Sequence, residues 1–120
     1  MNWNKNYLDK FKMYNYQVVW TNNAKYDLEN IIEYIKINSI SNAEKIFFEI
    51  KETCNNLYYF PLKCRIVPEL QQIGVMKYRE LIYKRWRIIY KIDNKKIYIL
   101  IVVDTSRNVE DLLFQRLLKR

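Results

Sequence analysis

The sequence predicts an α+β domain in which an antiparallel helix hairpin packs on an antiparallel β-meander. Residues 77–107 contain three segments rich in β-branched and aromatic side chains, separated by two short basic turns, and such side chains favour strands. Residues 24–35 and 43–57 carry apolar side chains every three or four positions, which is typical of amphipathic helices. Because a short strand precedes both helices, we expect the helices to lie across one face of the sheet.

The length of 120 residues fits one domain. We expect residues 14–120 to form that domain and residues 1–13 to be a loosely attached N-terminal extension. No apolar run is long enough to cross a membrane, and the N-terminus lacks the apolar region of a signal peptide. We therefore expect a cytoplasmic protein without a membrane partner, in which Cys54 and Cys64 are reduced.

The formal net charge is +8 and the sequence pI is about 9.5. This excess of cations favours a nucleic acid, the ribosome or an acidic protein as partner, and the alternative is a surface of solvated lysines. Histidine is absent and cysteine occurs twice, so we expect neither a metal site nor another cofactor. The lack of histidine also removes the usual general base near neutral pH, which leaves Arg, Lys, Tyr or a carboxylate for any catalysis.

The first expected elements are a strand at Tyr16–Thr21 and a helix. Asn22 and Asn23 are the side chains that we expect to cap this helix at its N-terminus. Its apolar stripe is evenly spaced and consists of Ala24, Leu28, Ile31 and Ile35.

A second helix is predicted to follow after a short break, which makes the pair an antiparallel hairpin. Ser41 and Glu44 have the spacing of a capping box. Its apolar face comprises Ala43, Ile46, Phe47, Ile50, Cys54 and Leu57. We expect Cys54 to be a small core residue and Pro61 to lie beyond the end of the helix.

The sequence also predicts which residues lie opposite one another in the first two strands of the meander. A two-residue turn at Lys84-Arg85 places three pairs opposite one another: Tyr83 with Trp86, Leu81 with Ile88, and Arg79 with Tyr90. The last strand, residues 97–103, is apolar at every position and is expected to be central. Strict alternation would place Ile97, Ile99, Ile101 and Val103 on one face. The face of the sheet opposite the helices is expected to be partly open.

A short C-terminal helix is predicted after Asn108, which we expect to cap it. Its apolar edge consists of Val109, Leu112, Leu113 and Leu117. This edge packs either on its own domain, which we favour, or on a partner.

The order of five motifs resembles that of the RelE/ParE toxins of bacterial type II toxin–antitoxin systems. The motifs are YQVVWTNNAKYDL followed by two helices, R-x-V-P-E-L at Arg65–Leu70, YREL at Tyr78–Leu81, RIIY at Arg87–Tyr90, and IYILIVVDTSR. The resemblance covers about residues 14–114. It implies a toxin that inhibits growth and is neutralised by a cognate antitoxin in a hetero-oligomeric complex.

The resemblance leaves the target open. ParE-like members poison DNA gyrase and need no catalytic residues, whereas RelE-like members are ribosome-dependent endoribonucleases that cut mRNA. The two-helix hairpin and the VPEL segment favour the ParE-like interpretation slightly. A further alternative is an inactive module that retains antitoxin binding.

If the chain is a ribonuclease, the resemblance places Arg79 and Arg107 at the scissile phosphate, with Lys77 adding positive charge. The alternative for Arg79 is a structural role, such as a bond to a backbone carbonyl. For Arg107 it is a solvated cation or an ion pair with Asp111.

Other positions depart from the nuclease pattern. Asp104 stands where many relatives have histidine, and the segment after Arg107 holds no tyrosine. Tyr90 and Glu80 remain as proton-transfer candidates, although neither is at the expected place and Tyr90 is the more typical of a core residue.

Overall fold

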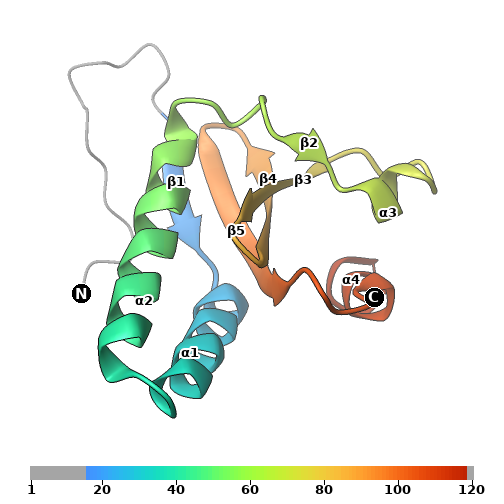
Figure 1. Cartoon of the computed structure of the whole chain (residues 1–120). Coiled ribbons are helices and arrows are strands. Elements are labelled where there is room, and N and C mark those ends of the chain that lie inside the picture. The colour runs from blue at the N-terminus through green and yellow to red at the C-terminus, as the bar shows by residue number, and fades with distance from the viewer. Residues whose placement is uncertain (1–15, 119–120) are drawn as a thin grey trace.

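The computed structural model describes residues 16–118, and its elements form the predicted α+β architecture (Figure 1). The predicted extension, residues 1–13, lies outside the described residues. The elements are β1 (Gln17–Trp20), α1 (Asn22–Lys36), α2 (Ile40–Asn55), a 3₁₀ turn (Asn56–Tyr58), β2 (Arg65–Ile66), α3 (Pro68–Gln71), β3 (Tyr78–Tyr83), β4 (Trp86–Asp93), β5 (Lys96–Asp104), α4 (Glu110–Leu113) and a π-helical turn (Phe114–Leu118).

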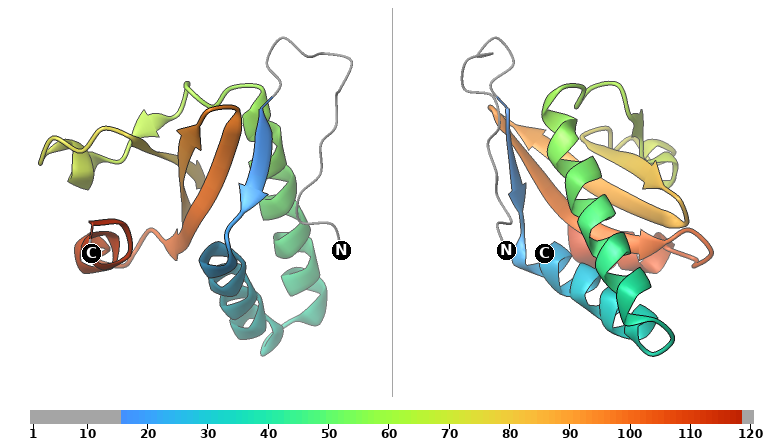
Figure 2. Two further views of the ribbon diagram at one scale, coloured as in Figure 1. Left: turned by 180° about the vertical axis from the view of Figure 1, so that it is seen from behind. Right: turned by 60° about the vertical axis from the view of Figure 1, so that its left-hand side comes forward.

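The five strands form one sheet in the order β1-β5-β4-β3-β2. β1 runs parallel to β5, and the other neighbours are antiparallel. The three predicted pairs between β3 and β4 are confirmed, and β5 is an inner strand, as predicted. The hairpin of α1 and α2 covers one face of this sheet, whereas α3 and α4 lie on the side of the sheet away from that hairpin (Figures 1 and 2).

A β-bulge in β5 changes which side chains share a face. Ile89 pairs with Ile101 and Tyr90 with Ile99, so Leu100 is an extra residue in β5. An inserted residue reverses the alternation of side chains beyond it. Ile97 and Ile99 therefore contribute to the core beneath the helices, but Ile101 and Val103 contribute to the core on the opposite face. The prediction that these four residues share one face is wrong.

Both helices begin one or two residues earlier than predicted. Thr21 caps α1, and its hydroxyl accepts a hydrogen bond from the Ala24 amide at 3.3 Å while donating one to the Ile99 carbonyl at 2.7 Å. Ser39 caps α2 and accepts from the Asn42 amide at 3.0 Å. The predicted caps at Asn22, Asn23 and Ser41 are wrong, because all three residues already lie inside the helices. Ser41 is the second residue of α2.

The core beneath the helices is apolar. The predicted second-helix stripe is buried apart from Phe47, which is half-buried, and Cys54 is fully buried, as predicted. On α1 the buried positions are Ala24, Leu28 and Ile32, with Ile31 and Ile35 half-buried. These side chains pack against Ile88, Tyr90, Ile97 and Ile99 of the sheet.

A second core lies on the opposite face of the sheet. It contains Val67, Leu70, Tyr78, Ile89, Ile101, Val103, Val109 and Leu113. The C-terminal segment therefore packs on its own domain, as favoured, and this face is more fully covered than predicted. The N-cap of α4 is Val109, although the Asn108 side chain accepts a bond from the Glu110 amide at 3.2 Å.

Candidate functional site

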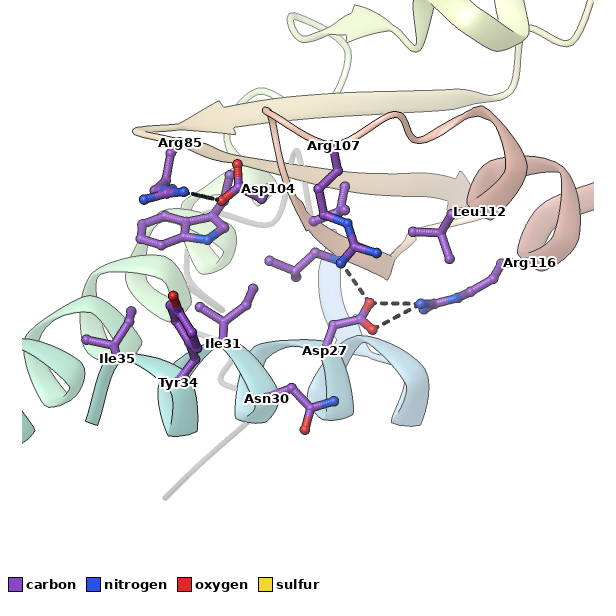
Figure 3. A pocket seen from close by; sticks show the side chains of 13 residues that line it. Asp27, Asn30, Ile31, Tyr34, Ile35, Arg85, Asp104, Arg107, Leu112 and Arg116 are labelled. Carbon is purple, nitrogen blue, oxygen red and sulfur yellow. Dashed lines mark hydrogen bonds and ion pairs between the residues drawn. The ribbon is translucent and has the colours of Figure 1, made fainter. Parts of the chain in front are cut away.

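A pocket of about 380 Å³ lies between α1, the end of β5 and the C-terminal helix (Figure 3). Its apolar wall includes Ile31, Ile35, Trp86 and Val102, and three arginines, Arg85, Arg107 and Arg116, line it as well. The apolar wall and the guanidinium groups together suit a ligand that has both an apolar part and a negative charge.

Asp27 and Arg116 form an ion pair on one side of this pocket. The Arg116 Nη1 lies 3.0 Å from both Asp27 oxygens, and Arg116 Nη2 donates to the Leu100 carbonyl at 2.7 Å. The Asp27 carboxylate also accepts a hydrogen bond from the Val102 amide at 3.0 Å. The pair thus fastens both α1 and the C-terminal segment to the end of β5.

Asp104 and Arg107 lie on the other side of the pocket. The Asp104 carboxylate accepts from the Ser106 amide and from Arg85 Nε, both at 2.8 Å. The Ser106 amide first, and Arg85 in addition, lower the pKa of Asp104. Arg107 is exposed, and its side chain points toward Asp27 (Figure 3). An exposed arginine can either contact a phosphate or remain solvated, so both of these interpretations of Arg107 stay predictions.

Arg79 lies on the helix-covered face and holds the loop that follows α2. Its Nη1 donates to the Cys64 carbonyl at 2.6 Å and to the Leu62 carbonyl at 3.3 Å. The Tyr90 hydroxyl donates to the Pro61 carbonyl of the same loop at 2.6 Å. Arg79 therefore makes the backbone contact that its structural alternative predicted, while its contact with a phosphate stays a prediction.

Tyr90 and Glu80, the two proton-transfer candidates, are both buried. Burial raises the pKa of the Tyr90 phenol, which disfavours its anion. Glu80 accepts from Arg65 Nε at 2.5 Å and from Arg87 Nε at 2.7 Å.

Arg87 extends this network to α3 through a bidentate pair with Glu69, at 2.7 and 2.9 Å. The hydrogen bond from Arg87 holds the pKa of Glu69 below its usual range. Such charge-assisted, bidentate pairs fix geometry strongly. The network accordingly anchors α3 to the sheet.

The three predicted catalytic residues do not converge. Arg79 lies opposite Tyr90, whereas Asp104, shortly before Arg107, lies opposite Trp86 at the far end of β4. Four residues of strand separate these two levels, or roughly 13 Å. Lys77 is exposed immediately before β3, with its ammonium 5.4 Å from the Tyr78 ring centre, and so lies near the Arg79 end.

No sequence pattern predicted the pocket. Asp27 and Arg116 are 89 positions apart, and no local spacing pairs them. Within residues 16–118 the structure contains no group of three or more side chains suited to hold a metal ion. Every helix in that part of the chain is too short or too polar to cross a bilayer.

Comparison with known proteins gives the class of the molecule. The sequence model described as "ParE toxin of type II toxin-antitoxin system, parDE" matches residues 18–109, which is most of the chain. The fold and this match define a toxin of a type II toxin–antitoxin system. The chain belongs to the ParE toxin family.

A solved structure agrees with the fold. The chain superposes with a TM-score of 0.63 on a protein from the chromosomal ParDE toxin–antitoxin system of P. aeruginosa. The similarity covers 76% of this chain and 97% of the other, at 21% sequence identity, which is evidence for the fold alone. No curated protein sequence matches the chain.

Proposed function

We propose that this toxin inhibits growth by acting on DNA gyrase rather than by cutting mRNA, and that a cognate antitoxin neutralises it in a hetero-oligomeric complex. Membership of the ParE family supports this target. The alternative, ribosome-dependent cleavage, requires a group that activates the ribose 2′-hydroxyl.

The burial of both proton-transfer candidates is the observation that carries the proposal. Tyr90 is bonded to the Pro61 carbonyl, and Glu80 lies between Arg65 and Arg87. Neither side chain is exposed to an RNA strand. The wide separation of Arg79 from Arg107 also argues against a single phosphate site. A toxin that works by binding a protein needs neither an accessible proton-transfer group nor a single phosphate site.

The charge distribution supports an acidic protein partner. Residues 22–55 hold six acidic and four basic side chains, whereas residues 56–118 hold six acidic and twelve basic ones. The sheet and the C-terminal segment thus carry most of the positive charge. An acidic antitoxin that covers this part of the chain would bind with electrostatic complementarity.

The proposal is tested by inducible expression in bacteria, with DNA integrity and transcript cleavage followed in one culture. We expect early DNA damage with intact transcripts, and we expect the purified toxin to inhibit supercoiling by gyrase. Early transcript cleavage that disappears in Arg107→Ala would instead identify a ribonuclease. Arg107 is exposed, so this substitution tests chemistry without disturbing the core. Unchanged growth after induction would identify an inactive antitoxin-binding module.

A further inference from the structure

The end of β5 is an open sheet edge. β1 pairs with β5 as far as Trp20 opposite Ile99, but β5 continues to Asp104. Among residues 16–118, the stretch from Leu100 to Asp104 therefore has β4 on one side and no strand on the other. Unpaired backbone groups at such an edge readily pair with another chain.

Two side chains occupy the first positions of this edge. Arg116 donates to the Leu100 carbonyl at 2.7 Å, and Asp27 accepts from the Val102 amide at 3.0 Å. A residue of an adjacent strand would supply the same donor and acceptor from its backbone. The ion pair of Asp27 and Arg116 thus replaces one residue of strand, directly beyond the end of β1.

The next positions of the edge face the pocket. The Val102 amide bonds outward to Asp27, whereas the Thr105 amide bonds to the Arg85 carbonyl in the turn that joins β3 to β4, at 2.7 Å. Because bonding direction alternates along a strand, the Val102 carbonyl and the Asp104 amide point away from β4. Both residues line the pocket. They offer one acceptor and one donor to an extended peptide.

The other walls of the pocket determine the side chains of such a peptide. Ile31 and Ile35 of α1 are half-buried and offer aliphatic surface. Arg107 is exposed and points into the pocket (Figure 3), whereas Arg85 and Arg116 are paired with Asp104 and Asp27. The arrangement suits one apolar side chain against α1 and one carboxylate on Arg107.

We propose that this pocket binds an extended, acidic segment of the antitoxin, which pairs with Val102–Asp104 in line with β1 and places a carboxylate on Arg107. The inference rests on the proposed antitoxin partner, and it specifies where and by what chemistry that partner binds.

The first test compares hydrogen exchange in the free toxin and in its complex with the antitoxin encoded beside it. We expect the Asp104 amide to exchange at least tenfold more slowly in the complex, because a backbone acceptor then covers it. An unchanged rate at Asp104 in a stable complex would overturn the proposal.

The second test measures antitoxin affinity for two charge reversals. Arg107→Glu is expected to weaken binding at least tenfold because it repels the carboxylate. Lys45→Glu changes the net charge equally on the exposed surface of α2, and we expect less than a twofold effect. Equal losses for both variants would mean that overall charge, rather than the pocket, governs binding.

A steric variant distinguishes the pocket from the rest of the basic surface. Asn30→Trp places a bulky ring in the pocket from an exposed position of α1, and Asn42→Trp makes the same change on α2. We expect Asn30→Trp alone to weaken the complex at least tenfold. Full affinity in Asn30→Trp would refute the pocket, whereas a wild-type toxin that binds no antitoxin would refute the proposed function itself.

Discussion

The two faces of the sheet are stabilised in different ways. The face beneath α1 and α2 is filled with apolar side chains, many of them fully buried. The opposite face has a smaller apolar core, beside which Glu80 and Arg87 are buried as an ion pair. The first face depends on packed volume, and the second depends also on matched charge.

This difference shows how a short, highly basic chain covers both sides of one sheet. Two long helices bury enough apolar surface to hold the first face by the hydrophobic effect. On the second face α3 and α4 have four residues each. The pairs from Arg87 to Glu69 and Glu80 supply the fixed geometry that so short an α3 cannot supply by packing.

The largest effect is expected from removing the carboxylate at the centre of the ion-pair network. Glu80→Ala should lower the free energy of unfolding by about 4 kcal/mol, because it leaves the buried Arg87 with one partner fewer. Urea denaturation measures the change.

The exposed Glu29→Ala on α1 serves as the control for Glu80→Ala, with an expected change below about 0.5 kcal/mol. A loss of less than about 1 kcal/mol in Glu80→Ala would contradict the importance of charge on this face.

A cavity in the helix-covered face should have the next largest effect. Leu28 is fully buried in α1, and Leu28→Ala should cost about 3 kcal/mol through lost burial and an unfilled cavity. The same denaturation experiment applies. Leu62→Ala removes an equal volume from a side chain that is 63% exposed, and we expect little change. Equal costs for the two leucines would show that this face does not depend on packed volume.

The smallest expected effect is a pH dependence of stability that comes from the ion pairs of the second face. Because the pKa of Glu69 is lowered in the folded chain, its contribution is complete above the ordinary carboxyl pKa of about 4.3 and is lost as the pH falls through the folded value. Glu69→Gln should cost about 1 kcal/mol at pH 7 and progressively less on acidification.

Urea midpoints for wild type and Glu69→Gln between pH 7 and pH 3 give this difference directly. A gap between the two proteins that stays constant over the whole range would mean that the charge of Glu69 contributes nothing to stability.

Local patterns accounted for much of the fold. Strand pairs that follow from a two-residue turn, such as Leu81 with Ile88, were predicted correctly, because so short a turn allows only one register between the two strands. The bulge at Leu100 was not predictable, since an all-apolar strand has no polar side chain to mark the reversal of its faces.

The site was harder to predict than the fold. The ion pair of Asp27 with Arg116 depends on the ends of the domain meeting, which spacing in the sequence does not encode. The loop bond of Arg79 was foreseen as one of two alternatives, because an arginine at a strand end serves a carbonyl or a phosphate equally well.

The parallel pairing of β1 with β5 has a consequence for how the cell makes this protein. The Thr21 hydroxyl that caps α1 also bonds Ile99, 78 residues later. On the ribosome the first strand emerges long before its partner, and long-range pairing of this kind forms late in folding. The nascent toxin therefore cannot complete its sheet until β5 has been translated and has left the ribosome.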